Sequence, residues 1–129
     1  MLGKGFSTNM HKTILIAEDY DDTRSFMKFL LEDFGYEVEE ASNGQEAIEK
    51  VKIHFPNLIF MDMAMPIMDG LTATQIIRKF DGAARLPIIA VTAFGKSYYR
   101  QAIEAGCDDL INKPLDEALL KSILDQYLI

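Results

Sequence analysis

The chain is 129 residues long, with a net charge of −7, an isoelectric point near 4.7 and a single cysteine. This length predicts one domain, and no apolar run approaches the ~20 residues that a membrane-spanning helix needs. The basic residues are scattered, which argues against direct nucleic-acid binding, because phosphate contacts need clustered Lys and Arg. A lone Cys107 excludes an internal disulfide and fits a reducing compartment, so we expect a cytoplasmic protein without membrane contacts.

The N-terminal third predicts a tail, a buried strand and an amphipathic helix. Residues 1–11 show no periodicity and are expected to form a flexible tail before a domain over residues 12–129. Thr13–Ala17 is a continuous apolar run, typical of a strand that is buried on both faces. The acidic residues that follow it suit the N-terminus of a helix. Spacing predicts that one face of this helix is buried, formed by Phe26, Phe29, Leu30 and Phe34.

The rest of the chain alternates strands with helices. Further strands are predicted over residues 36–41, 58–62, 87–92 and 108–112. Helices are predicted over residues 44–55, 69–80, 97–104 and 116–127. Five strands alternating with five helices predict an α/β fold, a single doubly wound (βα)5 domain with a five-stranded parallel sheet. The expected strand order is 2-1-3-4-5, which is flavodoxin-like.

Polar side chains stand where four of these strands end. Glu18 and Asp19 follow the first strand, Asp62 ends the third, Thr92 ends the fourth and Lys113 follows the fifth. The carboxyl ends of parallel strands share one edge of the sheet, so these five side chains should surround one crevice.

Three carboxylates in one crevice repel one another unless a cation is present. Few oxygen ligands with room for water favour Mg²⁺, with Mn²⁺ as an alternative, over zinc. A lysine beside such a site can bind an added anion, for which a phosphoryl group is the natural candidate. The residues therefore predict phosphoryl transfer onto or past Asp62.

The sequence resembles the receiver domain of two-component response regulators over residues 12–129. The matching segments are 14–19 (ILIAED), 58–70 (LIFMDMAMPIMDG), 87–93 (PIIAVTA) and 105–114 (AGCDDLINKP).

This resemblance implies a role for each polar residue. Asp62 would be the phosphoacceptor, and Thr92 and Lys113 would bind the phosphoryl oxygens. Mg²⁺ would be held by Glu18, Asp19, Asp62 and the backbone carbonyl of Met63. The Lys113–Pro114 peptide would be cis, as in the family.

The resemblance also implies partners. The phosphodonor would be a histidine kinase or a histidine phosphotransfer protein. A downstream protein would bind the face formed by residues 97–104, 108–112 and 116–127, where Tyr98, Tyr99 and Arg100 are candidate contacts. The domain would be a signalling switch rather than an enzyme that turns over substrate.

Four positions depart from the family pattern or modify it. Glu18 stands where aspartate is commoner, and the glutamate should still reach the metal. Leu110 stands where the family usually has a rotating Tyr or Phe, so the usual aromatic coupling is not available. Ala64 and Phe94, each two residues after a site residue, are apolar and cannot orient a water by hydrogen bonding. We therefore expect slow self-dephosphorylation.

Two other classes of protein share parts of this pattern. A phosphatase of the haloacid dehalogenase type needs a second aspartate two residues after the first, and Ala64 occupies that place. A flavodoxin-like ligand-binding module needs a loop rich in Gly, Ser or Thr after the first strand. The segment 18–22 (EDYDD) would instead repel phosphate. Both classes are disfavoured.

Overall fold

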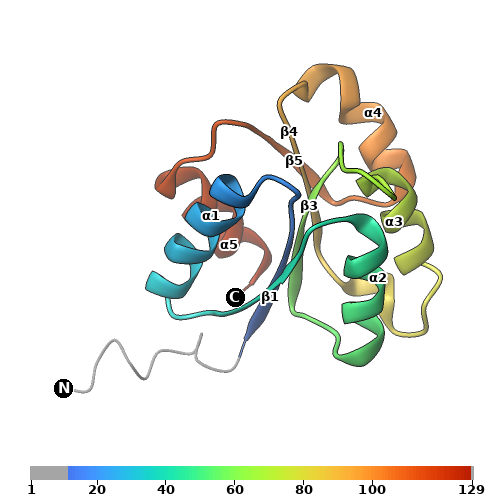
Figure 1. Cartoon of the computed structure of the whole chain (residues 1–129), viewed down its shortest axis with the longest axis horizontal. Helices are drawn as coiled ribbons and strands as arrows, with labels where there is room; N and C mark the ends of the chain where they lie inside the picture. Colours follow the sequence, from blue (N-terminus) through green and yellow to red (C-terminus); the bar gives the residue numbers. More distant parts are fainter. Residues whose placement is uncertain (1–11, 129) are drawn as a thin grey trace.

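One five-stranded parallel sheet forms the centre of the molecule (Figure 1). The computed structural model describes residues 12–128, so the tail predicted over residues 1–11 lies outside the described residues. The sheet order is β2-β1-β3-β4-β5, which confirms the predicted (βα)5 fold. The strands are β1 (Thr13–Ala17), β2 (Glu37–Ala41), β3 (Leu58–Asp62), β4 (Ile88–Thr92) and β5 (Asp109–Asn112). The helices are α1 (Asp21–Asp33), α2 (Gly44–Ile53), α3 (Gly70–Ile77), α4 (Gly95–Ala105) and α5 (Glu117–Tyr127), with a short 3-10 helix η2 (Ala83–Arg85) before β4.

Helices cover both faces of the sheet, and each face has its own hydrophobic core. α1 and α5 lie on one face, while α2, α3 and α4 lie on the other (Figure 1). Successive residues of β1 alternate between the two cores, with Ile14 and Ile16 on the α1/α5 side and Leu15 on the opposite side. This double burial explains why β1, β3 and β4 are apolar runs rather than alternating sequences.

The predicted buried face of α1 was wrong for two of its four residues: Leu30 is buried and Phe34 packs against the core as expected, but Phe26 and Phe29 do not. Phe26 and Phe29 are 48% and 67% exposed, whereas the helix buries Met27, Leu30 and Leu31. The buried stripe is therefore rotated away from Phe26 and Phe29 toward Met27 and Leu31, while Leu30 belongs to both stripes. As a result, two phenylalanine rings of α1 face solvent.

Side-chain caps fix the starts of three helices. The side chains of Asn43, Asp69 and Asp116 accept hydrogen bonds from backbone N–H groups in the first turns of α2, α3 and α5. Three helix limits differ from the sequence prediction by two residues or more. α2 ends at Ile53, two residues early, α3 ends at Ile77, three residues early, and α4 begins at Gly95, two residues early. Among the described residues, no helix is both long and apolar enough to span a bilayer.

Candidate functional site

Strand register brings the predicted site residues together at the carboxyl edge of the sheet. Ala17 of β1 pairs with Met61 of β3, so the next residue of each strand, Glu18 and Asp62, lie level with one another. On the other side of β3, β4 pairs with β5, and the last pair in their register is Thr92 with Asn112. The amide of Lys113, one residue further on, donates to the carbonyl of Thr92 at 2.8 Å. The same edge therefore presents groups from β1, β3, β4 and β5.

Lys113 bridges the two buried carboxylates. Its Nζ lies 2.8 Å from Glu18 Oε1 and 3.2 Å from Asp62 Oδ2. Glu18 and Asp62 are only 1% and 4% exposed, so this ammonium is their nearest counter-charge in a poorly solvated site. The peptide between Lys113 and Pro114 is cis, as predicted.

The pKa values of these three groups reflect burial and mutual charge. Burial, followed by the neighbouring Glu18 carboxylate, raises the pKa of Asp62 to about 7. Burial also acts to raise the pKa of Glu18, but Lys113 and the N–H of Tyr20 together hold it below its usual value. For Lys113, burial acts to lower the pKa, and the two carboxylates outweigh it and raise the pKa. In the absence of a cation, therefore, Asp62 holds a proton at mildly acidic pH while Glu18 stays ionised.

The donor set fits a divalent cation. Carboxylate oxygens of Glu18, Asp19 and Asp62 lie within 4.8 Å of one another, and Asp19 is exposed to solvent. Glu18 Oε1 is buried, and no described residue donates a well-aligned hydrogen bond to it, although Lys113 neutralises its charge. A buried carboxylate oxygen held only by an ion pair, next to two further carboxylates, is a suitable ligand for a hard cation.

Backbone N–H groups orient the other reactive side chains. The amide of Ala64 donates to Asp62 Oδ1 at 3.1 Å, which leaves Oδ2 toward Lys113. The Thr92 hydroxyl is buried and accepts the amide of Phe94 at 3.0 Å. The carbonyl of Met63, predicted as a metal ligand, accepts the amide of Gly70 at 3.2 Å. These contacts of Ala64 and Gly70 were missed by the sequence analysis because they depend on the backbone conformation of a loop.

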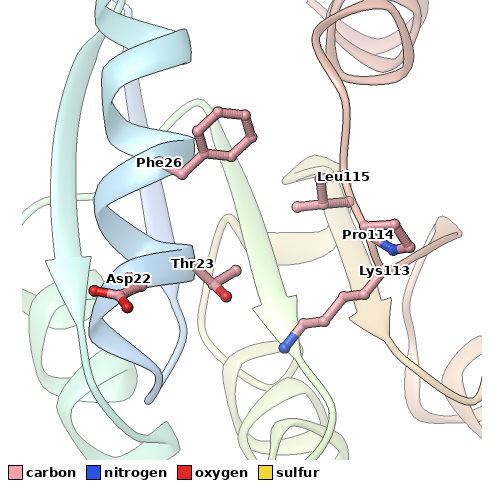
Figure 2. A pocket seen from close by; sticks show the side chains of 6 residues that line it. All are labelled: Asp22, Thr23, Phe26, Lys113, Pro114 and Leu115. Carbon is pink, nitrogen blue, oxygen red and sulfur yellow. The ribbon is translucent and has the colours of Figure 1, made fainter.

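A groove of about 490 Å³ opens beside the site (Figure 2). Its lining comes from the first turns of α1 and from the segment between β5 and α5: Asp22, Thr23, Phe26, Lys113, Pro114 and Leu115. In Figure 2 the Phe26 ring projects from α1 across the groove from Leu115, and Lys113 extends toward the end of β3. The groove thus lies between Lys113 and the exposed Phe26 of α1, which the sequence pattern predicts to lie in the core.

Comparisons with known proteins agree with this geometry. A family model described as the response regulator receiver domain matches residues 14–125. The chain is 45% identical over 107 residues to chemotaxis protein CheY of Bacillus subtilis, which covers 81% of this chain and 88% of CheY. The chain belongs to the response regulator receiver domain family.

Receiver domains of this kind occur alone and within larger proteins. Over 98% of its own length the chain is 37% identical to hybrid signal transduction histidine kinase G of Dictyostelium discoideum, but it spans only 4% of that protein. The receiver domain of a Pseudomonas aeruginosa sensor histidine kinase, solved with a magnesium ion coordinated in its active-site cleft, has a TM-score of 0.84 at 31% identity. The match covers 90% of this chain and 96% of that chain. These similarities confirm the predicted family and fold.

Proposed function

We propose that Asp62 accepts a phosphoryl group from a phosphohistidine on a partner protein. Asp62 Oδ2 would attack phosphorus, forming an O–P bond while the P–N bond breaks and the imidazole leaves. The main support is the position of Lys113, 3.2 Å from that oxygen and 2.8 Å from Glu18. The ammonium can move from a carboxylate to the incoming phosphoryl oxygens without leaving the site.

Thr92 is the second proposed phosphoryl ligand. Its hydroxyl is buried at the end of β4, next to β3, which carries Asp62. The hydroxyl accepts the Phe94 amide, so its own proton remains available for donation to an anion. Together, Thr92 and Lys113 would neutralise and orient a phosphoryl group on Asp62.

Glu18, Asp19 and Asp62 would hold Mg²⁺, with Mn²⁺ as a substitute. Bound there, the cation would supply positive charge against the transferring phosphoryl group. A backbone carbonyl is the remaining protein ligand that we infer. We propose the Met63 carbonyl for this place: it accepts the Gly70 amide at 3.2 Å with one lone pair, and its second lone pair would bind the cation.

The proposed phosphodonor is a histidine kinase or a histidine phosphotransfer protein. The groove lined by Phe26, Pro114 and Leu115 also contains Lys113, and apolar side chains of the donor would fill it. The proposed downstream face is the one formed by α4, β5 and α5. There Tyr99 and Arg100 are exposed, whereas Tyr98 is half-buried against the core.

We further propose that residues 12–129 act as a signalling switch rather than as an enzyme that turns over substrate, and that they work in the cytoplasm. Ala64, two residues after Asp62, lacks the carboxylate that a haloacid dehalogenase-type phosphatase uses at that place. Phe94 is exposed beside Thr92 and its ring lies 6.4 Å from that of Tyr98. Neither side chain can activate water, so the aspartyl phosphate should persist.

Phosphorylation by a small acyl phosphate tests the proposal without knowledge of the partner. Acetyl phosphate with Mg²⁺ should add one phosphoryl group, detected by intact-mass spectrometry, and hydroxylamine should remove it. Asp62→Asn should abolish the adduct, whereas Lys113→Ala should leave Asp62 in place but lower the yield. An adduct of equal yield on Asp62→Asn would refute the assignment of the phosphoacceptor.

A further inference from the structure

Arg24, in the first turn of α1, donates hydrogen bonds to three groups near the site: the backbone carbonyl of Glu18 and the side chains of Glu40 and Asp21. Its Nη1 donates to the backbone carbonyl of Glu18 at 2.8 Å. Its Nε donates to Glu40 Oε1 on β2 at 3.2 Å, and its Nη2 donates to Asp21 Oδ1 at 2.6 Å. The Arg24 side chain is only 17% exposed, so its contacts with Glu18 and Glu40 are better shielded from water than its contact with Asp21, which is 83% exposed.

The Glu18 carbonyl belongs to the peptide that joins two of the proposed metal ligands, Glu18 and Asp19. The preceding amide is fixed, because the N–H of Glu18 donates to the carbonyl of Ala41 at 2.9 Å. Beyond that bond the strand ends, and two hydrogen bonds hold the turn: one from Arg24 to the Glu18 carbonyl, and one from the Tyr20 N–H to Glu18 Oε2 at 3.0 Å. The Glu40 contact anchors the guanidinium to β2, which is paired with β1.

We propose that Arg24 is a positioning residue for the cation site. Its planar guanidinium uses separate donors for Glu18 and Glu40, and so fixes the turn that presents the Glu18 and Asp19 carboxylates. The inference rests on the proposed function, because it concerns the same carboxylates. It goes beyond that function by assigning the geometry of the site to a residue outside the ligand set.

A purely electrostatic role for Arg24 makes the opposite prediction. A positive charge near the carboxylates repels an incoming divalent cation, so its removal would strengthen cation binding. If Arg24 instead holds the turn, its removal weakens binding, and a lysine cannot replace it because a single ammonium lacks the planar fork. The sign of the change therefore separates the two roles.

The experiment measures Mn²⁺ affinity by electron paramagnetic resonance of the free ion. The variants are Arg24→Met, which removes charge and donors, and Arg24→Lys, which keeps the charge. Lys28→Met is the matched control, because Lys28 Nζ also bonds Glu40, at 3.3 Å, and Lys28 is one turn further along α1. Circular dichroism in EDTA sets a temperature at which every variant is folded.

We expect both Arg24 variants to weaken Mn²⁺ binding by about tenfold or more, the usual cost of losing a residue that orients a metal ligand. Lys28→Met should stay within about twofold of the wild type, since its role is limited to Glu40. Unchanged affinity in both Arg24 variants would overturn the proposal, as would tighter binding in Arg24→Met with wild-type affinity in Arg24→Lys. If the wild type binds no Mn²⁺, the proposed function fails instead, so the two failures are distinguishable.

Discussion

Acidification should weaken cation binding by protonating Asp62. Burial and the Glu18 carboxylate raise the pKa of Asp62 to about 7 in the cation-free domain. The cation binds the ionised carboxylate, so binding must displace the proton when one is present. With a pKa of about 7, the ionised fraction is about 0.9 at pH 8 and about 0.1 at pH 6, which predicts an affinity about tenfold lower at pH 6.

Two measurements test this linkage. Mn²⁺ affinity is determined at pH 6, 7 and 8, and proton release on binding is followed with an indicator dye in weakly buffered solution. Close to one proton per cation should be released at pH 6, and close to none at pH 8. Asp62→Asn should bind more weakly at every pH and lose most of the pH dependence, because the pKa of Glu18 is lowered and Glu18 stays ionised.

The raised pKa of Asp62 also determines how the stability of the cation-free domain, measured in EDTA, changes with pH. The folded pKa of Asp62 lies above its unfolded value of 3.8, so the folded state binds more protons between the two values. Its contribution to stability is therefore fully present below pH 3.8 and is lost as the pH rises through about 7. Asp62→Asn should stabilise the cation-free domain at pH 8 more than at pH 6. A flat affinity between pH 6 and 8, without proton release, would refute the reasoning.

Three further outcomes follow from other parts of the molecule. Gly70→Ala should destabilise the domain by about 3 kcal/mol in urea unfolding, because its Cβ would collide with the backbone carbonyl of Asp62. Gly82→Ala, at φ +85° with no atom within 4 Å of the new Cβ, should cost only about 1 kcal/mol, and an equal loss for both would contradict this. Burial raises the pKa of the Cys107 thiol to about 11. Iodoacetamide should therefore react with Cys107 slowly below pH 9 in the folded protein and quickly in urea. Equal reaction rates in the two conditions would show that the thiolate is accessible in the folded protein. Ala64→Asn and Phe94→Glu should each speed acyl-phosphate hydrolysis about tenfold by orienting water, and unchanged decay would disprove their role in its lifetime.

The strands and their order could be predicted because burial on both faces leaves a strong signal. β1, β3 and β4 are largely apolar runs; β3 and β4 end in a polar side chain, and β1 is followed by one. Once the strands alternate with helices, parallel pairing and right-handed crossovers leave few possible orders. The positions of Glu18, Asp62 and Thr92 then follow from the strand ends alone. The orientation of the loop amides does not, because it depends on backbone angles that no periodicity encodes.

The rotation of α1 could not be predicted because the helix carries two overlapping apolar stripes. One stripe contains Phe26 and Phe29, and the other contains Met27, Leu30 and Leu31. Composition favours the phenylalanines, since they have more apolar surface to bury. In the structure, α1 instead buries Met27, Leu30 and Leu31, and Arg24 reaches Glu18 and Glu40. The hydrogen bonds of Arg24 at the start of α1 are therefore consistent with burial of the face that carries Met27, Leu30 and Leu31. Phe26 and Phe29 are left exposed.

If phosphorylation of Asp62 acts on α4, as proposed, Leu110 requires a route between them that needs no aromatic rotation. Its side chain is half-buried and packs against the core beneath α2, α3 and α4. The Thr92 hydroxyl accepts the amide of Phe94, which is the N-cap residue of α4 and has no side-chain cap of its own. A phosphoryl group that drew this hydroxyl toward Asp62 would strain or break that hydrogen bond. The first turn of α4 would then lose a backbone contact directly, so the signal can pass through the main chain while Leu110 stays in place.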